Sequence, residues 1–367
     1  VLNTIETAPV VQDAAALIST GSDIVYFSRD YKFIKTGSPP QTFSFEKLPA
    51  STRSVLASTT SLYLAKPHEG GNAWLLGLGV GNKRWLAIIE PDGYRGYLVG
   101  APLSQVKADD AYWIDADRLM FVINGSVYTL DLTLNKINEY AEGVSGATHA
   151  GGKTYFVTRD KLSGKYMLMK DANMFDDRPA TAVSDTIPVG RHHAITIIDD
   201  DHITIVAETS GSQGLWLLRP PAEEPATVVE PKQLQLIKLA SSITSSLYDY
   251  LDGVIYYTVG DSLGNYELDT NVANILHSFP APPIIIGKRN QTLFIVSDKK
   301  LLATDPSGSN IYDLGSIAGA SVFLSSDSQR LWVLNNGQVA EWKLRGSSVG
   351  PFGILRPHPP KSKRVLA

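Results

Sequence analysis

The sequence predicts an all-β fold made of repeated four-stranded antiparallel sheets, and three observations support this prediction. The segment QTLFIVSD (291–298) recurs 38 residues later as QRLWVLNN (329–336). Related segments occur along the whole chain, with a mean spacing of about 44 residues. Long amphipathic segments with helical spacing are almost absent, which disfavours a helical repeat protein of similar period.

The recurring segments align on one column, which is aromatic in seven of the eight copies. We expect this column to mark the second strand of successive sheets, buried between neighbouring sheets. Its members are Tyr26, Tyr63, Phe121, Phe156, Thr204, Tyr256, Phe294 and Trp332.

Further strands flank each copy. A shorter apolar strand precedes it, a strand ending in aspartate follows it, and a fourth strand lies further on. The aspartates Asp131, Asp171, Asp269 and Asp305 recur at one position, which indicates turn stabilisation rather than catalysis. A single sheet of this kind leaves two faces uncovered, so the copies must stack, as the blades of a β-propeller do.

The strand pattern predicts a single β-propeller over residues 1–346 and a C-terminal tail or linker over 347–367. The last blade has only three strands, and the alternating segment VLNTIET (1–7) is expected to complete it beside QVAEWKL (338–344). The stretch 51–102 offers one strand too many, so seven irregular blades are the alternative to eight. The eight predicted blades are 11–49, 50–102, 103–143, 144–189, 190–241, 242–281, 282–319 and 320–346.

The segment FLSSDSQRLWVLNNGQVAEWKL (323–344) resembles the blade signature of the TolB, YVTN and WD40-like propellers. Ser325, Asp327 and Leu331 match the serine, aspartate and strand positions of that signature, and FIVSDKKLLATDPSG (294–308) resembles it more faintly. The histidine and tryptophan–aspartate marks of true WD40 repeats are missing, since Trp342 is followed by Lys343. The resemblance therefore implies the fold and names no partner.

Composition limits the classes of function. The net charge of −4, from 37 acidic and 33 basic residues, does not favour a nucleic-acid partner. The chain has no cysteine, which excludes thiol catalysis, thiolate metal sites and disulfides. This fits an extracytoplasmic protein, secreted or at the cell surface, with a cytoplasmic location as the alternative. No apolar run approaches about 20 residues, so no transmembrane segment is expected, and any signal or anchor would lie outside this chain.

No motif indicates an enzyme, a cofactor or a metal. A nucleophile-elbow motif G-x-S-x-G is absent, and GLGVGNKR (77–84) precedes no helix that would bind phosphate, so it predicts a hairpin turn. The densest titratable group runs from Arg191 to His202. Its adjacent histidines His192 and His193 point to opposite faces of a strand, and DDDH (199–202) predicts the turn between first and second strands. A shared metal ion is therefore not expected.

We expect ligands to bind at the loops that join second to third strands and fourth strands to the next blade. Their mixed charges suit a protein or peptide partner better than a small anionic cofactor. The favoured function is a monomeric, non-enzymatic binding platform, part of a bacterial envelope or secreted protein. A propeller glycan hydrolase or lyase with paired acids at the central channel is the alternative. The candidate binding residues are Arg53, His68, Asp109, His149, Arg159, Arg191, His192, Glu208, Asp261 and Asp298.

Overall fold

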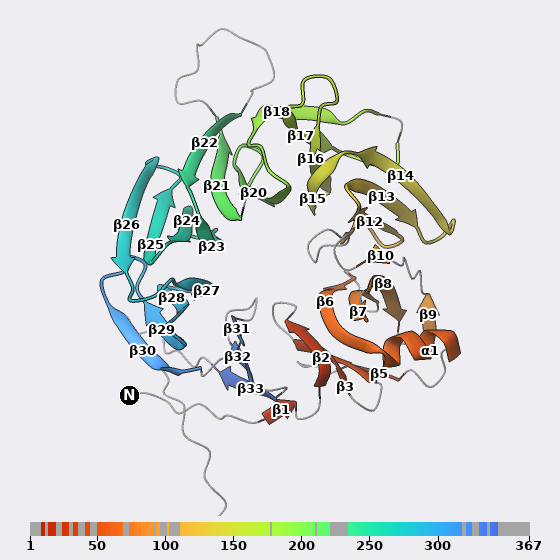
Figure 1. Ribbon diagram of the computed structural model, residues 1–367, viewed down its shortest axis with the longest axis horizontal. Helices are drawn as coiled ribbons and strands as arrows, with labels where there is room; N and C mark the ends of the chain where they lie inside the picture. Colours follow the sequence, from red (N-terminus) through yellow and green to blue (C-terminus); the bar gives the residue numbers. More distant parts are fainter. Residues whose placement is uncertain are drawn as a thin grey trace, which may run out of the picture. The chain divides into compact units, whose positions relative to one another are not determined.

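The described strands of the computed structural model form eight antiparallel sheets, seven with four strands and one with five (Figure 1). The chain divides into two compact units, residues 1–46 with 244–367 and residues 47–243. Within the described residues, no helix has the length and apolar character that crossing a membrane requires. The structure describes residues 9–11, 14–19, 24–28, 32–35, 41–44, 50–68, 73–81, 83–90, 93–95, 101–102, 111–176, 178–209, 211–220, 234–317, 321–324, 330–335 and 338–343.

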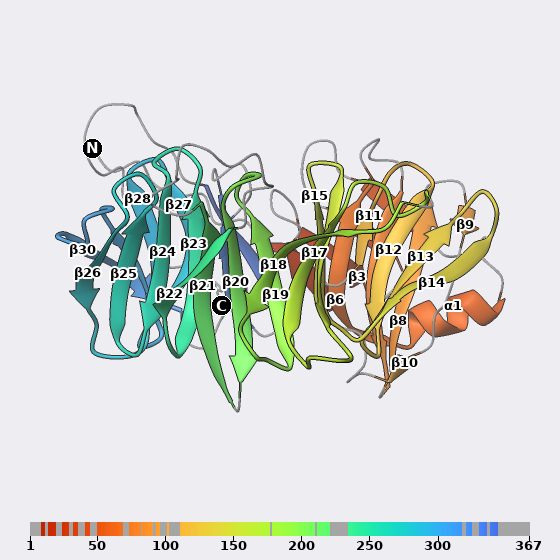
Figure 2. The ribbon, with the colours of Figure 1, turned by 90° about the horizontal axis from the view of Figure 1, so that it is seen from above.

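The unit of residues 47–243 contains four sheets, ordered β10-β8-β7-β6, β11-β12-β13-β14, β15-β16-β17-β18 and β19-β20-β21-β22, with β9 paired to β8 (Figure 2). Its elements are α1 (Ala50–Ala57), β6 (Thr59–Pro67), β7 (Trp74–Val80), β8 (Lys83–Glu90), β9 (Gly93–Arg95), β10 (Ala101–Pro102), β11 (Ala111–Trp113), β12 (Arg118–Ile123), β13 (Ser126–Asp131), β14 (Lys136–Glu142), β15 (Val144–Ala150), β16 (Lys153–Arg159), β17 (Tyr166–Asp171), β18 (Thr181–Ile187), β19 (His192–Ile197), β20 (Ile203–Thr209), β21 (Ser212–Arg219) and β22 (Gln235–Ala240).

The other unit contains the sheets β2-β3-β4-β5, β23-β24-β25-β26, β27-β28-β29-β30 and β1-β33-β32-β31. Its elements are β1 (Pro9–Val11), β2 (Ala14–Ser19), β3 (Ile24–Ser28), β4 (Lys32–Lys35), β5 (Gln41–Ser44), β23 (Ile243–Asp249), β24 (Val254–Val259), β25 (Ser262–Glu267), β26 (Val272–Ser278), β27 (Ile284–Arg289), β28 (Thr292–Ser297), β29 (Lys300–Thr304), β30 (Ile311–Ser316), β31 (Ser321–Leu324), β32 (Arg330–Asn335) and β33 (Gln338–Lys343).

The strand position of the predicted column is confirmed in seven sheets, where each member lies on the second strand, although Tyr26 is half-buried rather than buried. Phe121, Phe156, Tyr256, Phe294 and Trp332 are at most 5% exposed. Phe121, Phe156, Tyr256 and Phe294 belong to apolar clusters that join neighbouring sheets of the same unit. The side chain of Phe294, for example, packs in a cluster that joins β28 and β29 to β31 and β32. Burial of each such ring covers about 150–250 Å², which explains why the sheets stack.

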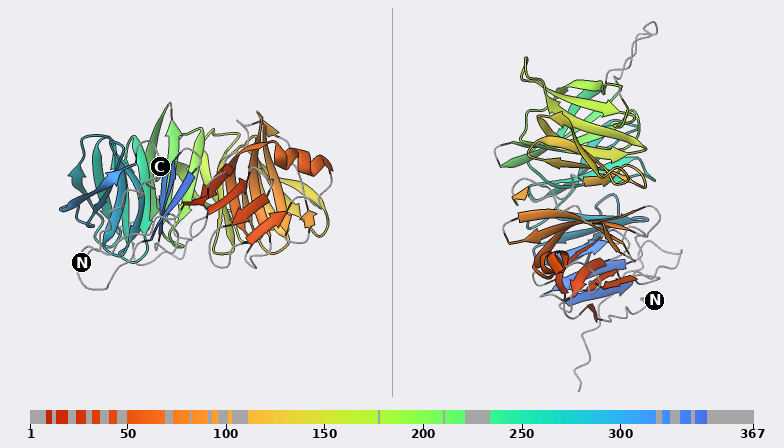
Figure 3. Two further views of the ribbon diagram at one scale, coloured as in Figure 1. Left: turned by 90° about the horizontal axis from the view of Figure 1, so that it is seen from below. Right: turned by 90° about the vertical axis from the view of Figure 1, so that its right-hand side faces the viewer.

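The position of Tyr63 was predicted wrongly, because it lies on β6, the first strand of its sheet. The segment before it forms the helix α1, the orange coil in Figure 3, which the sequence reading did not anticipate. β7 is therefore the second strand of that sheet, and β8 and β10 are the third and fourth. β6 is nine residues long with the apolar centre LYLA (62–65), so its pattern cannot be distinguished from that of a buried second strand.

An N-terminal strand completes the last sheet, as predicted. β1 pairs with β33, with Pro9 opposite Ala340 and Val11 opposite Val339 (Figure 1). The predicted strand at 1–7 and the tail at 347–367 lie outside the described residues. β1 covers one side of β33, which would otherwise be an open edge.

Three of the four aspartates predicted at the ends of third strands bind turn amides, as expected, whereas Asp269 lies two residues beyond the end of β25 at Glu267. A side-chain oxygen of Asp131 accepts the amide hydrogen of Leu134 at 2.8 Å, and Asp171 accepts that of Asn173 at 2.8 Å. Asp305 accepts two amide hydrogens of its turn, each at 3.1 Å. Val80 and Lys83 pair across the glycine-rich turn, so GLGVGNKR forms the predicted hairpin.

Candidate functional site

Seven of the ten predicted site residues lie at the expected kind of connection. In each sheet, the connection from the second to the third strand and the connection from the fourth strand to the first strand of the next sheet lie at the same edge. We call this edge the rim edge of the sheet. Arg53 lies in α1, in the connection to β6, and its side chain is exposed. The other six lie at or beside the end of a second strand or the start of a first strand: Arg159, Arg191, His192, Glu208, Asp261 and Asp298.

The placement of His68 and His149 on the rim edge was wrong. His68 follows the first strand β6, so it lies at the opposite edge, where its ring packs against that of Trp113 at 5.0 Å. His149 lies inside the first strand β15 near its turn into β16, and its Nδ1 is 3.0 Å from Thr154 Oγ1. First and second strands share the same apolar alternation, which is why their ends were confused. Asp109 lies outside the described residues.

The best-defined part of the rim edge is the place where the first strands β15 and β19 approach each other. A Cβ atom added to Gly146 would lie 1.7 Å from the main-chain oxygen of His193. The register of β15 shifts between Val144 and Gly146, so Ser145 occupies a bulge. Only glycine permits this approach, and the approach brings the Ser145 hydroxyl to the next sheet.

His193 joins the two sheets through both ring nitrogens. Its Nε2 is 2.8 Å from the carbonyl oxygen of Pro188, and its Nδ1 is 2.7 Å from Ser145 Oγ. A carbonyl oxygen only accepts, so Nε2 carries the hydrogen and Nδ1 accepts the hydroxyl hydrogen of Ser145. The side chain of His193 is 1% exposed, and this burial lowers its pKa. The imidazole is therefore neutral at pH 7.

Arg191 and His192 extend this arrangement toward solvent. His192 Nδ1 donates to the carbonyl oxygen of Ser145 at 3.1 Å, and His192 stands opposite Glu208 in the β19–β20 ladder. The Arg191 amide donates to the Glu208 carbonyl oxygen at 2.9 Å. The main chain of this corner is thus fixed, while the Arg191 side chain is exposed.

A well-bonded loop, residues 160–165, joins β16 to β17 at the same edge. One Asp160 side-chain oxygen accepts the amide hydrogens of Leu162 at 3.0 Å and Ser163 at 2.6 Å, and these bonds lower the pKa of Asp160. Arg159 Nε donates to the Gly164 carbonyl oxygen at 3.1 Å. The loop is therefore ordered, yet Leu162 at its tip is 98% exposed. Val189, in the connection from β18 to β19, is 73% exposed.

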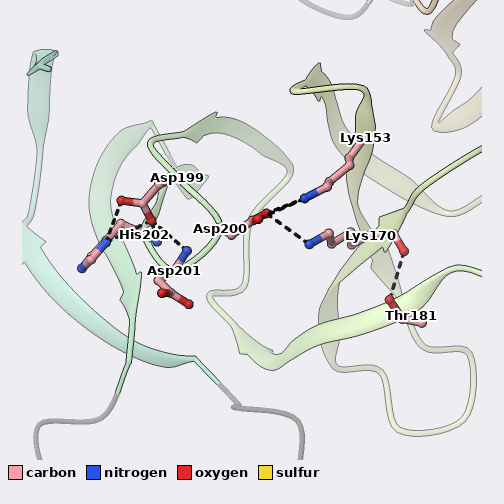
Figure 4. A network of polar contacts seen from close by, with 7 residues as sticks. All are labelled: Lys153, Lys170, Thr181, Asp199, Asp200, Asp201 and His202. Atoms are coloured by element: carbon pink, nitrogen blue, oxygen red, sulfur yellow. Dashed lines mark hydrogen bonds and ion pairs between the residues drawn. The ribbon is translucent and has the colours of Figure 1, made fainter.

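The opposite edge of the same two sheets carries a polar network (Figure 4). Lys153 and Lys170 both reach Asp200, at 2.8 and 3.3 Å, and they lower the pKa of its carboxyl group. Asp199 accepts the main-chain amide hydrogen of His202 at 2.7 Å and lies 3.1 Å from its ring. The group 191–202 is thus split between two edges, as the sequence predicted. No cluster suited to a metal ion occurs among the described residues.

A hollow of about 470 Å³ lies between the fourth strands β18 and β22. Asp185 is its one charged lining residue, so it gathers no titratable groups that would suggest chemistry. Its other lining residues are Ser184, Thr186, Leu234, Gln235 and Leu236.

In the other unit, a buried ion pair joins β23 to β27. Lys288 binds Asp249, and the two side chains are 7% and 8% exposed. Lys288 also binds Asp252, whose pKa it lowers. The carboxylates of Asp249 and Asp252 thus share one ammonium group.

Sequence reasoning missed three residues of the rim edge: Ser145, Leu162 and Val189. Leu162 carried a usable signal, since it is a lone apolar residue in the polar turn DKLSGK (160–165). Ser145 carried none, because its partner His193 is 48 residues away and only the fold brings them together.

Comparison with known proteins supports the fold class. No protein-family model matches the sequence, and no match was found among curated proteins. The structure is similar to that of the Dos1 propeller, with a TM-score of 0.57 at 12% identity over 97% of each chain. It is also similar to Porphyromonas gingivalis dipeptidyl peptidase 4, with a TM-score of 0.54 at 11% identity over 88% of this chain and 56% of that one. A eukaryotic initiation factor gives a TM-score of 0.53 at 10% identity, over 89% of this chain and 83% of that one. At these identities the likeness shows the fold alone, an all-β propeller.

Proposed function

We propose that this propeller is a non-enzymatic binding protein, which takes a protein or peptide partner at the rim edge of sheets β15–β18 and β19–β22. The observation that carries the proposal is the exposure of Leu162 and Val189, 98% and 73%, on an edge that also exposes Arg159 and Arg191. Exposed apolar side chains beside arginines are typical of protein interfaces. The loop that carries Leu162 is already ordered, which reduces the entropy lost on binding.

The alternative, a glycan hydrolase or lyase, needs two acids that can exchange protons with a sugar. Asp249 and Asp252 are near each other, but Lys288 binds both and keeps Asp252 ionised. This favours a structural role for the pair and a binding role for the protein. Release of reducing sugar from a panel of polysaccharides by the purified chain would argue against the proposal.

Photocrosslinking tests the proposed surface. A photoreactive amino acid is placed at Leu162 in one variant and at Leu134 in the control. Leu134 is 69% exposed in the β13–β14 turn, at the opposite edge of the same unit. We expect one partner from the native source to crosslink at position 162 and not at 134, and the crosslink at 162 to weaken when Val189→Ser is added to that variant. Equal crosslinking at both positions would refute the rim edge as the binding surface.

We further propose that the protein works as a monomer outside the cytoplasm. The absence of cysteine supports the location, since a thiol-free chain suits an oxidising compartment. Light scattering of the purified chain tests the monomer, and fractionation of the source cells tests the location. Recovery in the cytoplasmic fraction would contradict this proposal without affecting the binding surface.

A further inference from the structure

We propose that the partner presents an acidic segment carrying one large apolar side chain, and that this segment lies across the rim edge between Leu162 and Arg191. The inference rests on the proposed binding function and names the chemistry of the partner. Its two supports are the position of the apolar side chains and the balance of charge around them.

The apolar contacts lie close together. Leu162 is at the turn between β16 and β17, and Val189 follows β18, which is the neighbour of β17. Tyr166 and Ile187 pair at the end of the β17–β18 ladder, with Leu162 four residues before Tyr166 and Val189 two residues after Ile187. The two apolar side chains therefore leave the sheet at the same edge, where one partner segment can contact both.

The loop holds Leu162 in place before any partner arrives. In addition to the Asp160 side-chain contacts, the Asp160 amide donates to the Lys165 carbonyl oxygen at 2.8 Å, and the Gly164 amide donates to the Asp160 carbonyl oxygen at 2.9 Å. Arg159 adds its bond to Gly164, and its guanidinium lies 6.0 Å from the Tyr166 ring. The same Tyr166 ring is 5.1 Å from that of His193, so the loop is tied to the seam between the sheets.

The charge around these contacts is in positive excess. Arg159, Lys165 and Arg191 are exposed, and no carboxylate binds any of them among the described residues. Lys161 is the cation of this loop that is paired, with Glu142 at 3.0 Å.

The acids of the edge offset this excess only in part. Asp160 accepts the amide hydrogens of Ser163 and Leu162, which lower its pKa and keep it negatively charged, and Glu208 lies beside Arg191. The described edge therefore carries four cations, Arg159, Lys161, Lys165 and Arg191, against three acids, Glu142, Asp160 and Glu208, which is an excess of one positive charge. An acidic segment would complement the three unpaired cations, and the two guanidinium groups would bind carboxylates in bidentate fashion.

The test uses the full chain and a random peptide library displayed on phage. We expect the selected peptides to carry aspartate or glutamate beside a leucine or aromatic residue. A synthetic copy of one selected peptide is then titrated by fluorescence anisotropy against four proteins. These are the wild type, Arg159→Glu/Arg191→Glu, Leu162→Ser/Val189→Ser, and the control Lys136→Glu/Leu134→Ser, whose changes are at the opposite edge.

The expected result is that affinity falls about tenfold or more in each rim-edge variant and stays unchanged in the control. Affinity for the wild type should also fall as salt rises, because exposed charges are screened. Circular dichroism of every variant confirms that it is folded.

Each other outcome has a distinct meaning. Peptides without acidic residues that still lose affinity in Leu162→Ser/Val189→Ser would overturn the acidic partner and leave the proposed function intact. Peptides whose affinity survives both rim-edge variants would overturn the site. If no peptide is selected but acidic lipid vesicles or inorganic phosphate bind the wild type and not Arg159→Glu/Arg191→Glu, the edge binds anions and the peptide partner is refuted.

Discussion

Two seams between neighbouring first strands, one in each unit, each contain a bridging serine hydroxyl, but it accepts a hydrogen bond in one seam and donates one in the other. In the β23–β27 seam, Ser245 Oγ accepts the Ile285 amide hydrogen at 2.9 Å. In the β15–β19 seam, Ser145 Oγ donates to His193 Nδ1 at 2.7 Å. A backbone amide does not titrate near neutral pH, whereas a histidine does. We therefore expect stability at the β15–β19 seam to depend on pH, and stability at the β23–β27 seam not to.

The seams differ also in how they are held. The β15–β19 seam depends on close approach of two backbones, which leaves no room for a side chain at Gly146. The β23–β27 seam contains the buried pair of Lys288 and Asp249 instead. The stability of the β15–β19 seam therefore depends on the close fit of two backbones. The stability of the β23–β27 seam depends on pairing of buried charges.

The largest effect is expected for Gly146→Ala, which tests the shape of the β15–β19 seam. The new Cβ would lie 1.7 Å from a backbone oxygen, so the two sheets must separate. We expect a loss of more than about 4 kcal/mol in the free energy of unfolding, measured by urea titration.

Two other glycine changes calibrate that result. Gly152→Ala, at φ +70° with nothing within 4 Å of the added Cβ, should cost about 1–2 kcal/mol from backbone strain alone. In Gly287→Ala the added Cβ meets the movable side chain of Leu324 at 2.5 Å, so its cost should be intermediate. If Gly146→Ala is no worse than Gly152→Ala, the close approach of β15 and β19 is not real.

The next effect tests the charged seam. Lys288→Met leaves Asp249 as an unpaired buried carboxylate, and we expect a loss of about 3–5 kcal/mol at pH 7. The control Lys300→Met breaks the exposed pair with Asp313, whose side chains are 52% and 48% exposed, and should cost about 0–1 kcal/mol. Equal losses in the two variants would show that the Lys288 pair is not buried in solution.

These seams show what the sequence could and could not predict. The aromatic column and the turn aspartates repeat along the chain, so the strands and most strand positions followed from local pattern alone. The prediction for Tyr63 failed because a buried first strand and a buried second strand have the same alternation of apolar and polar residues. Ser145 and His193 belong to different repeats, and no spacing rule relates them. The sequence therefore predicted which kinds of loop form the candidate site. The contacts between its residues, such as that of Ser145 with His193, could be seen only in the structure.

The third prediction compares the two serines directly. Ser145→Ala and Ser245→Ala each leave a buried polar group without its partner, so each should cost about 1–3 kcal/mol at pH 7.5. When His193 is protonated at low pH, Ser145 can still form a hydrogen bond with it. The Ser145 hydroxyl then donates to the Val157 carbonyl oxygen, 3.3 Å away, and its oxygen accepts the hydrogen of the protonated Nδ1.

Ser145→Ala removes this second role and should lower the pKa of His193 further. Its cost should therefore increase as the pH falls through the lowered folded pKa of His193, while the cost of Ser245→Ala stays constant. Urea titrations of both variants from pH 5 to 7.5 measure this difference. Parallel pH dependence in the two variants would remove the distinction between a fixed and a responsive seam.

The smallest expected effect concerns His193 itself. Burial lowers its pKa below the ordinary value of 6.5, so between these two pKa values the unfolded chain binds more protons than the folded one. Folding stability from this group is therefore complete above about pH 6.5 and is lost as the pH falls toward the folded pKa, by at most about 1.4 kcal/mol per pH unit.

His193→Gln keeps a donor for the Pro188 carbonyl oxygen but cannot titrate, so its stability should depend less steeply on pH than that of the wild type. Burial also lowers the pKa of His149, so some slope should persist in the variant. Identical slopes for the wild type and His193→Gln between pH 5 and 6.5 would mean that His193 is not the group that makes the β15–β19 seam respond to acid.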